Sequence, residues 1–315
     1  MRSAMQMTKK TTLRDVAKEA GVSVATASYV LNNVTNQTIP TETKKRVYEA
    51  AEKLQYVQNL TARALSLGRT NLLGVLLVGD ESDLISKHIS YGKFIDRLER
   101  LSLEQNYHLI VARIDPRQPN FDIILERKLD GAFVIDAAES SFYAVSEKFK
   151  FGSPVVLVDS AIADPLFRHV TPDFGQLFGI ISQLCGDQPY VIAHEKYHNQ
   201  TLTDSLYAAS GVGSDRVYAI ARDSGSLTAF AREHRNKPLV VFNEFLALHL
   251  MKDCDPSNMV VVCTSDCPDF LPRSVRRIVP MADKAKTTFE LMHALLGEPF
   301  SASDRMLPFA AMDPE

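Results

Sequence analysis

From residue 71 onward, the sequence alternates short apolar runs of β type with stretches of helical character. The β-type runs lie at 72–78, 108–114, 131–135, 154–158, 190–193, 217–221, 238–242 and 259–263. The helical candidates lie between them, at 91–105, 175–184, 202–209, 244–252 and 283–296. This alternation predicts parallel sheets with helices on both faces, which is also why the strands are almost continuously apolar. The predicted strands are too many for one small sheet, so we expect an α/β core of two similar lobes over residues 71–315.

The start of the chain has a different pattern, made only of short helices. Thr12 can cap a helix whose apolar residues share one face, with Asp15 three residues on as in a capping box. Gly21 ends that helix, and Ser23 can cap a second one close behind. Pro40 begins a third helix. Two short helices joined by a short turn containing glycine predict a helix-turn-helix.

The charge of the chain is unevenly distributed between these two parts. Residues 1–70 hold 11 Lys and Arg against 5 Asp and Glu, a net charge of +6. The remaining residues carry −9, so that the whole chain has a formal net charge of only −3. A basic head on an acidic body indicates a nucleic-acid-binding module attached to a globular core.

Composition excludes several other classes of protein. The chain is 45% hydrophobic and 23% charged, which is ordinary for a globular protein and argues against global disorder. No uncharged apolar run approaches the ~18 residues of a spanning helix, and the first seven residues lack the apolar core of a secretion signal. We therefore expect a cytoplasmic protein. Its few cysteines fit reduced thiols better than a disulfide framework: Cys185, Cys254, Cys263 and Cys267.

The first 75 residues also carry a long ordered motif. It begins with Leu13-Arg14-Asp15-Val16-Ala17-Lys18-Glu19-Ala20-Gly21-Val22-Ser23 and continues through Thr26, Ser28, Val30, Leu31, Asn32, Arg46-Val47, Ala50-Ala51, Leu54, Tyr56, Asn59, Ala62-Arg63, Leu65, Arg69-Thr70 and Gly74-Val75. This text resembles the DNA-binding region of the LacI/GalR family of bacterial transcription regulators. The resemblance implies a disordered N-terminus (1–11), a helix-turn-helix domain (12–57), a hinge helix and linker (58–70) and a two-lobed core like periplasmic sugar-binding proteins (71–315). It also implies a cytoplasmic homodimer of the repressor type that binds a near-palindromic DNA operator and takes no cofactor.

The resemblance assigns the second helix to the major groove of the operator. Val24 and Ala25 occupy the main specificity positions of the family, where small apolar side chains can contact thymine methyl groups. The alternative is that both only pack within the head. Tyr29 stands where the family usually has arginine, so we expect an operator that departs from the commonest half-site.

Further residues of the motif fit contacts with the DNA backbone and with the minor groove. Leu65, in the hinge helix, is expected to wedge between base pairs at the operator centre, flanked by Asn59, Ala62 and Arg63. Hydroxyl and amide side chains suit phosphate contacts that set the register of the protein on the DNA. Thr12 and Ser23 can instead serve only as helix caps. These residues are Thr12, Ser23, Thr26, Ser28 and Asn32.

The core is expected to hold a small-molecule effector, such as a sugar or sugar derivative, in the cleft between its lobes. Asp159, Asn243 and Asp266 match or lie near family positions that contact effectors. The segment 198–204 lacks the arginine that often clamps sugar hydroxyls, and the tail lacks the usual closing strand that contains arginine. The alternative is therefore a regulator with a degenerate cleft that is independent of ligand or controlled by a protein partner.

Signals for enzymatic chemistry are weak. His194-Glu195-Lys196-Tyr197-His198 matches the zinc-protease text HExxH, but it leaves a β-type run instead of lying on a helix. Cys263 and Cys267 have no second pair at metal spacing. We predict no catalytic residues and no metal site.

Overall fold

A computed structural model describes residues 11–31, 38–56, 68–142, 153–164, 167–186, 188–220, 224–298 and 302–312. The chain divides into two compact units, Met1–Thr70 and Asn71–Glu315. Each unit is described by itself.

The first unit has the predicted helix-turn-helix. Helix α1 (Leu13–Ala20) begins at Thr12 with a complete capping box and ends at Gly21, whose backbone is left-handed (φ 64°). Helix α2 (Val24–Leu31) follows after a short turn, and α3 (Thr41–Lys53) crosses both. The helices share a small core of Val16, Ala17, Ala20, Ala27, Val30, Val47 and Ala50.

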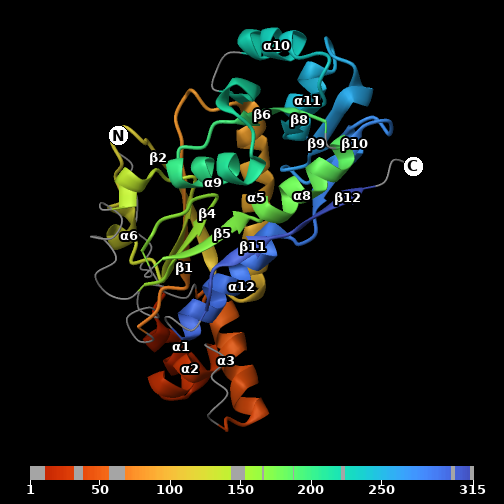
Figure 1. Ribbon diagram of the computed structural model, residues 1–315. Helices are drawn as coiled ribbons and strands as arrows, with labels where there is room; N and C mark the ends of the chain where they lie inside the picture. Colours follow the sequence, from red (N-terminus) through yellow and green to blue (C-terminus); the bar gives the residue numbers. More distant parts are fainter. Residues whose placement is uncertain are drawn as a thin grey trace, which may run out of the picture. The chain divides into compact units, whose positions relative to one another are not determined.

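The second unit contains two six-stranded sheets (Figure 1). The first has the order β11-β5-β4-β3-β1-β2 and is parallel throughout. Its strands are β1 (Leu72–Val78), β2 (His108–Ile114), β3 (Gly131–Ile135), β4 (Val155–Val158), β5 (Arg168–Pro172) and β11 (Arg305–Leu307). The second has the order β12-β10-β9-β8-β6-β7, and only β12 runs antiparallel. Its strands are β6 (Val191–Glu195), β7 (Val217–Ile220), β8 (Leu239–Phe242), β9 (Met259–Val262), β10 (Arg276–Pro280) and β12 (Phe309–Met312).

Helices cover both faces of each sheet, as the apolar strands require. On the first sheet, α5 (Ile85–Glu104) and α12 (Lys284–Gly297) share one core with the strands, and α6 (Ile123–Glu126) lies in a second. On the second sheet, α8 (Phe174–Cys185) and α9 (Gln200–Ser210) pack on one face. Helices α10 (Ser224–Glu233) and α11 (Glu244–Leu250) pack on the other. The α/β fold with two lobes is therefore confirmed.

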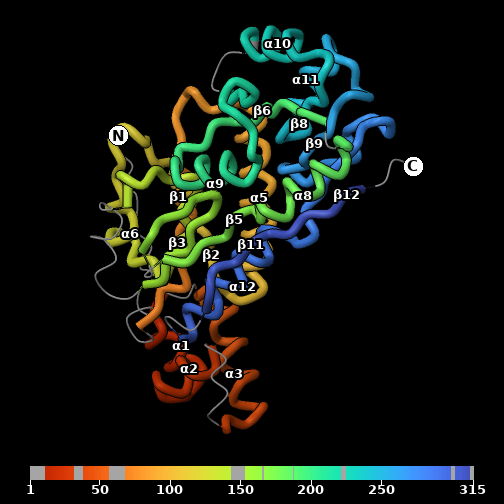
Figure 2. Tube along the Cα trace, in the orientation of Figure 1, coloured from red at the N-terminus to blue at the C-terminus, as the bar shows by residue number. Residues whose placement is uncertain are grey.

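The chain crosses between the two lobes three times. It passes from β5 to α8, from β10 to α12, and from β11 to β12, so α12 belongs to the first lobe although β10 belongs to the second. Figure 2 shows the last crossing as the C-terminal segment that runs from one sheet to the other. The tail does form closing strands, and β11 contains Arg305. The prediction of a tail without such a strand was wrong, because strands of only three or four residues are too short to show a periodicity.

Candidate DNA-binding face and ligand cleft

Helix α2 presents two distinct faces. Ala27 and Val30 are buried against the other helices of the first unit. Val24 and Tyr29 are 43% and 40% exposed, and Ala25 is exposed as well. Two exposed large hydrophobic residues on one short helix leave an uncovered surface of the kind that reads bases in the major groove.

The hydroxyls at the starts of α1 and α2 act as helix caps. Thr12 Oγ1 accepts a hydrogen bond from Asp15 N (3.4 Å), and Thr12 N donates to Asp15 Oδ2 (2.9 Å). Ser23 Oγ accepts from Thr26 N (3.0 Å) and lies 2.9 Å from the Thr26 hydroxyl. This capping accounts for Thr12 and Ser23 without DNA, so their phosphate contacts stay predictions, as does that of the half-buried Ser28.

Five of the predicted DNA contacts lie outside the described residues. They are Asn32 after α2 and the hinge residues Asn59, Ala62, Arg63 and Leu65.

A cavity of about 580 Å³ lies between the two lobes of the second unit. Each lobe contributes the ends of its strands, and all three crossings contribute to the lining: Pro172 at the first, Pro280 to Lys284 at the second, Leu307 and Phe309 at the third. Cavities of roughly 300–1,000 Å³ hold small molecules. A ligand here would touch the segments that must bend if the lobes move.

Several polar residues at the strand ends have left-handed backbone. Asp136, Asp159 and Asn243 directly follow β3, β4 and β8, with φ of 53°, 50° and 98°. Asp266, in the turn after β9, has φ of 52°. Asp and Asn tolerate this region better than other residues with a β-carbon, which explains these residue types at these positions.

Asp159 lines the cavity but its carboxylate already has partners. It forms an ion pair with Lys284 at the start of α12 and accepts a hydrogen bond from Tyr91 Oη (3.2 Å). Lys284 also lies over the rings of Tyr91 and Phe94, 5.8 and 5.7 Å from their centres. Burial raises the pKa of Tyr91 well above its usual value, and the nearby charge of Asp159 adds to the effect.

Asn243 and Asp266 differ in their position relative to the cavity. Asn243 is buried behind the cavity lining, where its Nδ2 donates to Ser90 Oγ (3.1 Å) and Ser265 Oγ (3.0 Å), both of which line the cavity. Asp266 lines the cavity at its exposed margin and pairs with Lys93 of α5 at 3.3 Å. Of the three predicted effector residues, the structure thus brings Asp159 and Asp266 to the cavity and places Asn243 behind it, bonded to Ser90 and Ser265.

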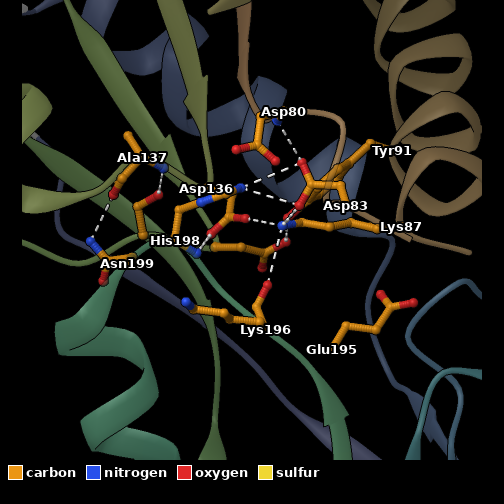
Figure 3. A network of polar contacts seen from close by, with 12 residues as sticks. Asp80, Asp83, Lys87, Tyr91, Asp136, Ala137, Glu195, Lys196, His198 and Asn199 are labelled. Atoms are coloured by element: carbon orange, nitrogen blue, oxygen red, sulfur yellow. Dashed lines mark hydrogen bonds and ion pairs between the residues drawn. The ribbon is translucent and has the colours of Figure 1, made fainter. Parts of the chain in front are cut away.

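The lobes are joined beside the cavity by a buried ionic network (Figure 3). Lys87 of α5 pairs with Asp83 (2.8 Å) and with Asp136. His198, from the other lobe, donates its backbone N–H to Asp136 (2.9 Å) and places Nε2 3.1 Å from Asp83. Burial raises the pKa of Asp136 to about 6, against the opposing charge of Lys87. Burial also opposes ionisation of Asp83, but the bond from His198 and the charge of Lys87 prevail and hold its pKa well below the usual value.

The residues of the HExxH text form no metal site. His194 is buried in β6, where Nδ1 faces Glu195 O (2.9 Å) and Nε2 faces the Tyr207 hydroxyl (3.2 Å), and burial lowers its pKa to about 4. His198 points instead to the network around Lys87. Among the described residues no group of three or more His, Cys, Asp and Glu is placed to hold a metal ion. Nor is any described helix long and apolar enough to cross a membrane.

Sequence reasoning missed the residues that reach the cavity from the helices and from the loop after β6. These include Tyr91 and Lys93 of α5, Lys284 of α12, and Lys196 and Tyr197 of the loop. The one available signal was the helix start at Asp283, which places Lys284 at the end of a crossing.

Comparison with known proteins assigns the first unit to a family. The sequence model for "Bacterial regulatory proteins, lacI family" matches residues 12–59, which span the capped helices of the first unit. The first unit carries the DNA-binding domain of this family, and the chain resembles the LacI/GalR transcription regulators. Members of this family are regulators and not enzymes.

Relatives within the LacI/GalR family match only part of the chain. A sucrose operon repressor of Pediococcus pentosaceus is 30% identical over 169 residues, which cover 52% of this chain and 48% of the repressor. The transcriptional regulator RegA of Clostridium acetobutylicum is 36% identical over 123 residues, which cover 38% of this chain and 34% of RegA. The chain thus spans about half the length, or less, of these relatives.

Solved structures of LacI/GalR proteins match nearly the whole fold. The lac repressor dimer bound to operator and an anti-inducer superposes with a TM-score of 0.70 at 16% identity, covering 97% of this chain and 98% of the repressor chain. The regulator CelR in complex with cellobiose gives a TM-score of 0.55 at 15% identity, covering 96% and 98%. At these identities the likeness supports the fold.

Proposed function

We propose that this protein is a sequence-specific DNA-binding transcription repressor whose α2 lies in the major groove. The observation that carries the proposal is the exposed face of α2, where Val24, Ala25 and Tyr29 are uncovered while Ala27 and Val30 anchor the helix. Small apolar side chains can contact thymine methyls, and the Tyr29 hydroxyl can bond to a base acceptor or a phosphate. The name of the sucrose operon repressor agrees with this role.

The proposed repressor acts as a homodimer on a near-palindromic operator. A helix-turn-helix head reads one half-site, so a two-fold dimer reads two half-sites related by symmetry. Thr26, Ser28 and Asn32 would fix the register on phosphates, and Leu65 would open the minor groove at the centre. The lac repressor of similar fold is a dimer bound to operator, which supports the same arrangement here.

The proposed regulation is by a small molecule in the cleft between the lobes. Its support is the cavity of about 580 Å³, lined by all three crossings and by Asp159 and Asp266. A ligand that binds one lobe arrangement better than another shifts their populations, and by linkage it changes the affinity for DNA. The cavity favours this account over a regulator without a ligand.

In vitro selection tests the proposal, with the full chain used to capture duplexes from a pool of randomised DNA. We expect enrichment of one near-palindromic sequence, bound with a dissociation constant on the order of 10⁻⁸–10⁻¹¹ M at physiological salt. Binding that is equally strong to every duplex and is lost with added salt would show only charge attraction and would overturn the proposal.

A further inference from the structure

One of the cations that line the cavity between the lobes has no carboxylate partner among the described residues. Six basic and five acidic side chains line it. Four of the acids each take one of the cations, in the pairs Asp96–Arg100 (2.8 Å), Asp283–Arg97 (3.0 Å), Asp266–Lys93 (3.3 Å) and Asp159–Lys284. A fifth cation, Lys87, is paired with two carboxylates, those of Asp83 and Asp136.

Lys196 is the sixth cation, and its ammonium group is not neutralised. It is exposed in the loop after β6, and its Nζ makes no hydrogen bond or ion pair with any described residue. The fifth acid, Glu195, accepts a hydrogen bond from Ser86, and burial raises its pKa to about 7, so it is only partly charged at neutral pH. Lys196 is therefore the one Lys or Arg of the lining without a carboxylate partner among the described residues.

Lys284 adds free hydrogen-bond donors on the opposite lobe. An ammonium group has three N–H donors, and the described residues accept only one, through Asp159. Its side chain is 26% exposed, and its ammonium lies against the rings of Tyr91 and Phe94. Two donors of a partly desolvated cation therefore remain for a ligand.

We propose that the cleft takes a small anionic ligand, bearing a carboxylate or phosphate group held between Lys196 and Lys284. The inference rests on the proposed function, in which the cleft is the effector site. An anion pairs with the Lys196 ammonium and accepts charge-assisted hydrogen bonds from both lysines, whereas a neutral ligand accepts weaker bonds and a cation is repelled by both ammonium groups. The less polar part of the ligand packs on Tyr197, Phe242 and Phe309. Because the two lysines belong to opposite lobes, the anionic group joins the lobes.

Thermal unfolding of the full chain with matched ligands tests this proposal. Neutral sugars are compared with their sugar acids and sugar phosphates of three to seven carbons, and inorganic phosphate is measured alone. We expect the anions to raise the melting temperature and their neutral parents not to, with an effect that weakens as salt is added. Stabilisation by the acids alone identifies a carboxylate ligand, and stabilisation by the phosphates alone identifies a phosphate ligand.

A matched pair of variants locates the anionic group. Lys196→Gln removes an exposed charge without leaving any carboxylate unpaired, so the variant should fold. It should weaken anion binding about tenfold or more. Lys286→Gln removes an exposed lysine of α12 that pairs with Glu290 and does not line the cavity, and it should leave binding unchanged.

Two results would overturn the anionic class. One is equal stabilisation by neutral and anionic ligands with no effect of Lys196→Gln. The other is no stabilisation by any anion. Operator binding, measured on the same samples, separates this failure from failure of the proposed function, because a protein that binds its operator but no anion remains a DNA-binding regulator.

Discussion

The side-chain amide of Asn199 pairs with the backbone of Ala161 through two hydrogen bonds. Asn199 Nδ2 donates to Ala161 O and Asn199 Oδ1 accepts from Ala161 N, each at 3.1 Å. The same side chain donates to Ala137 O (2.9 Å) and caps α9 through Leu202 N (2.8 Å). Because Asn199 belongs to the second lobe and Ala137 and Ala161 to the first, one buried amide joins the lobes.

Asn199→Asp should destabilise the second unit strongly. The change replaces a donor by an oxygen that faces two carbonyl oxygens in a buried site, so we expect a loss of roughly 3 kcal/mol. Urea unfolding measures it, with the exposed Asn106→Asp as the control that should change little. Equal stability of the two variants would show that this amide does not hold the lobes together.

Lys87→Met should also be costly, because it leaves Asp83 and Asp136 without their shared cation. Breaking one side of a buried ion network costs about 3–5 kcal/mol. The second change Asp136→Asn, made in the Lys87→Met background, removes one uncompensated acid and should restore part of the loss. Lys93→Met, which breaks an exposed pair, should cost under ~1 kcal/mol in the same denaturant titration.

Glu195→Gln should stabilise the protein more at pH 8 than at pH 4. Burial raises the pKa of Glu195 from 4.5 to about 7, opposed by Ser86 and Lys87 and reinforced by Asp83 and Glu244. Below pH 4.5 the carboxyl is protonated in both states and costs nothing, whereas above pH 7 the folded state must hold an unfavourable carboxylate. The advantage of the variant should therefore appear between these values, up to about 3 kcal/mol.

Unfolding free energies at several pH values test the Glu195 prediction. The exposed Glu104→Gln is the control for replacing a carboxyl by an amide at the surface. A stability difference for Glu195→Gln that is the same at pH 4 and pH 8 would contradict the raised pKa.

Thr12 offers a way to separate capping from DNA contact. Thr12→Ala removes the side-chain cap of α1 and should lower the stability of the head by about 1 kcal/mol, whereas Thr12→Ser keeps the hydroxyl and should lose little. Hydrogen exchange of the α1 amides in the full chain reports this directly. If the amides exchange at the same rate in both variants, the capping box contributes nothing and the hydroxyl is left with the phosphate role alone.

The sequence predicted the mostly apolar strands of each sheet better than the strands next to the crossings. Strands β1, β3, β4, β6, β8 and β9 are detectable because burial on both faces makes them largely apolar. The edge strands β2 and β7 are only partly buried, but their sequences HLIVARI and VYAI are still mostly apolar. Strands β5 and β10, with the sequences RHVTP and RRIVP, were missed because their ends are only partly buried. Helix α10 was missed as well, since its first turn is rich in serine and glycine.

The candidate sites could be predicted only where local pattern sufficed. The capped helices of the head follow from adjacent residues, and Asp159 and Asp266 follow from their places near strand ends. The pairing of Lys284 with Asp159 joins residues that are distant in the chain, and the place of Asn243 behind Ser90 depends on packing between lobes. Neither contact can be predicted from the spacing of residues in the sequence.

The central claim, that the exposed face of α2 reads DNA, is tested most directly by the affinity of one variant for the selected operator. Fluorescence anisotropy at fixed salt compares the unaltered protein with Tyr29→Ala and with Glu52→Ala, an exposed change on α3. We predict that Tyr29→Ala weakens operator binding about tenfold or more, with the melting temperature and the binding of unrelated DNA preserved, and that Glu52→Ala does not weaken it. Unchanged operator affinity in Tyr29→Ala would contradict the account.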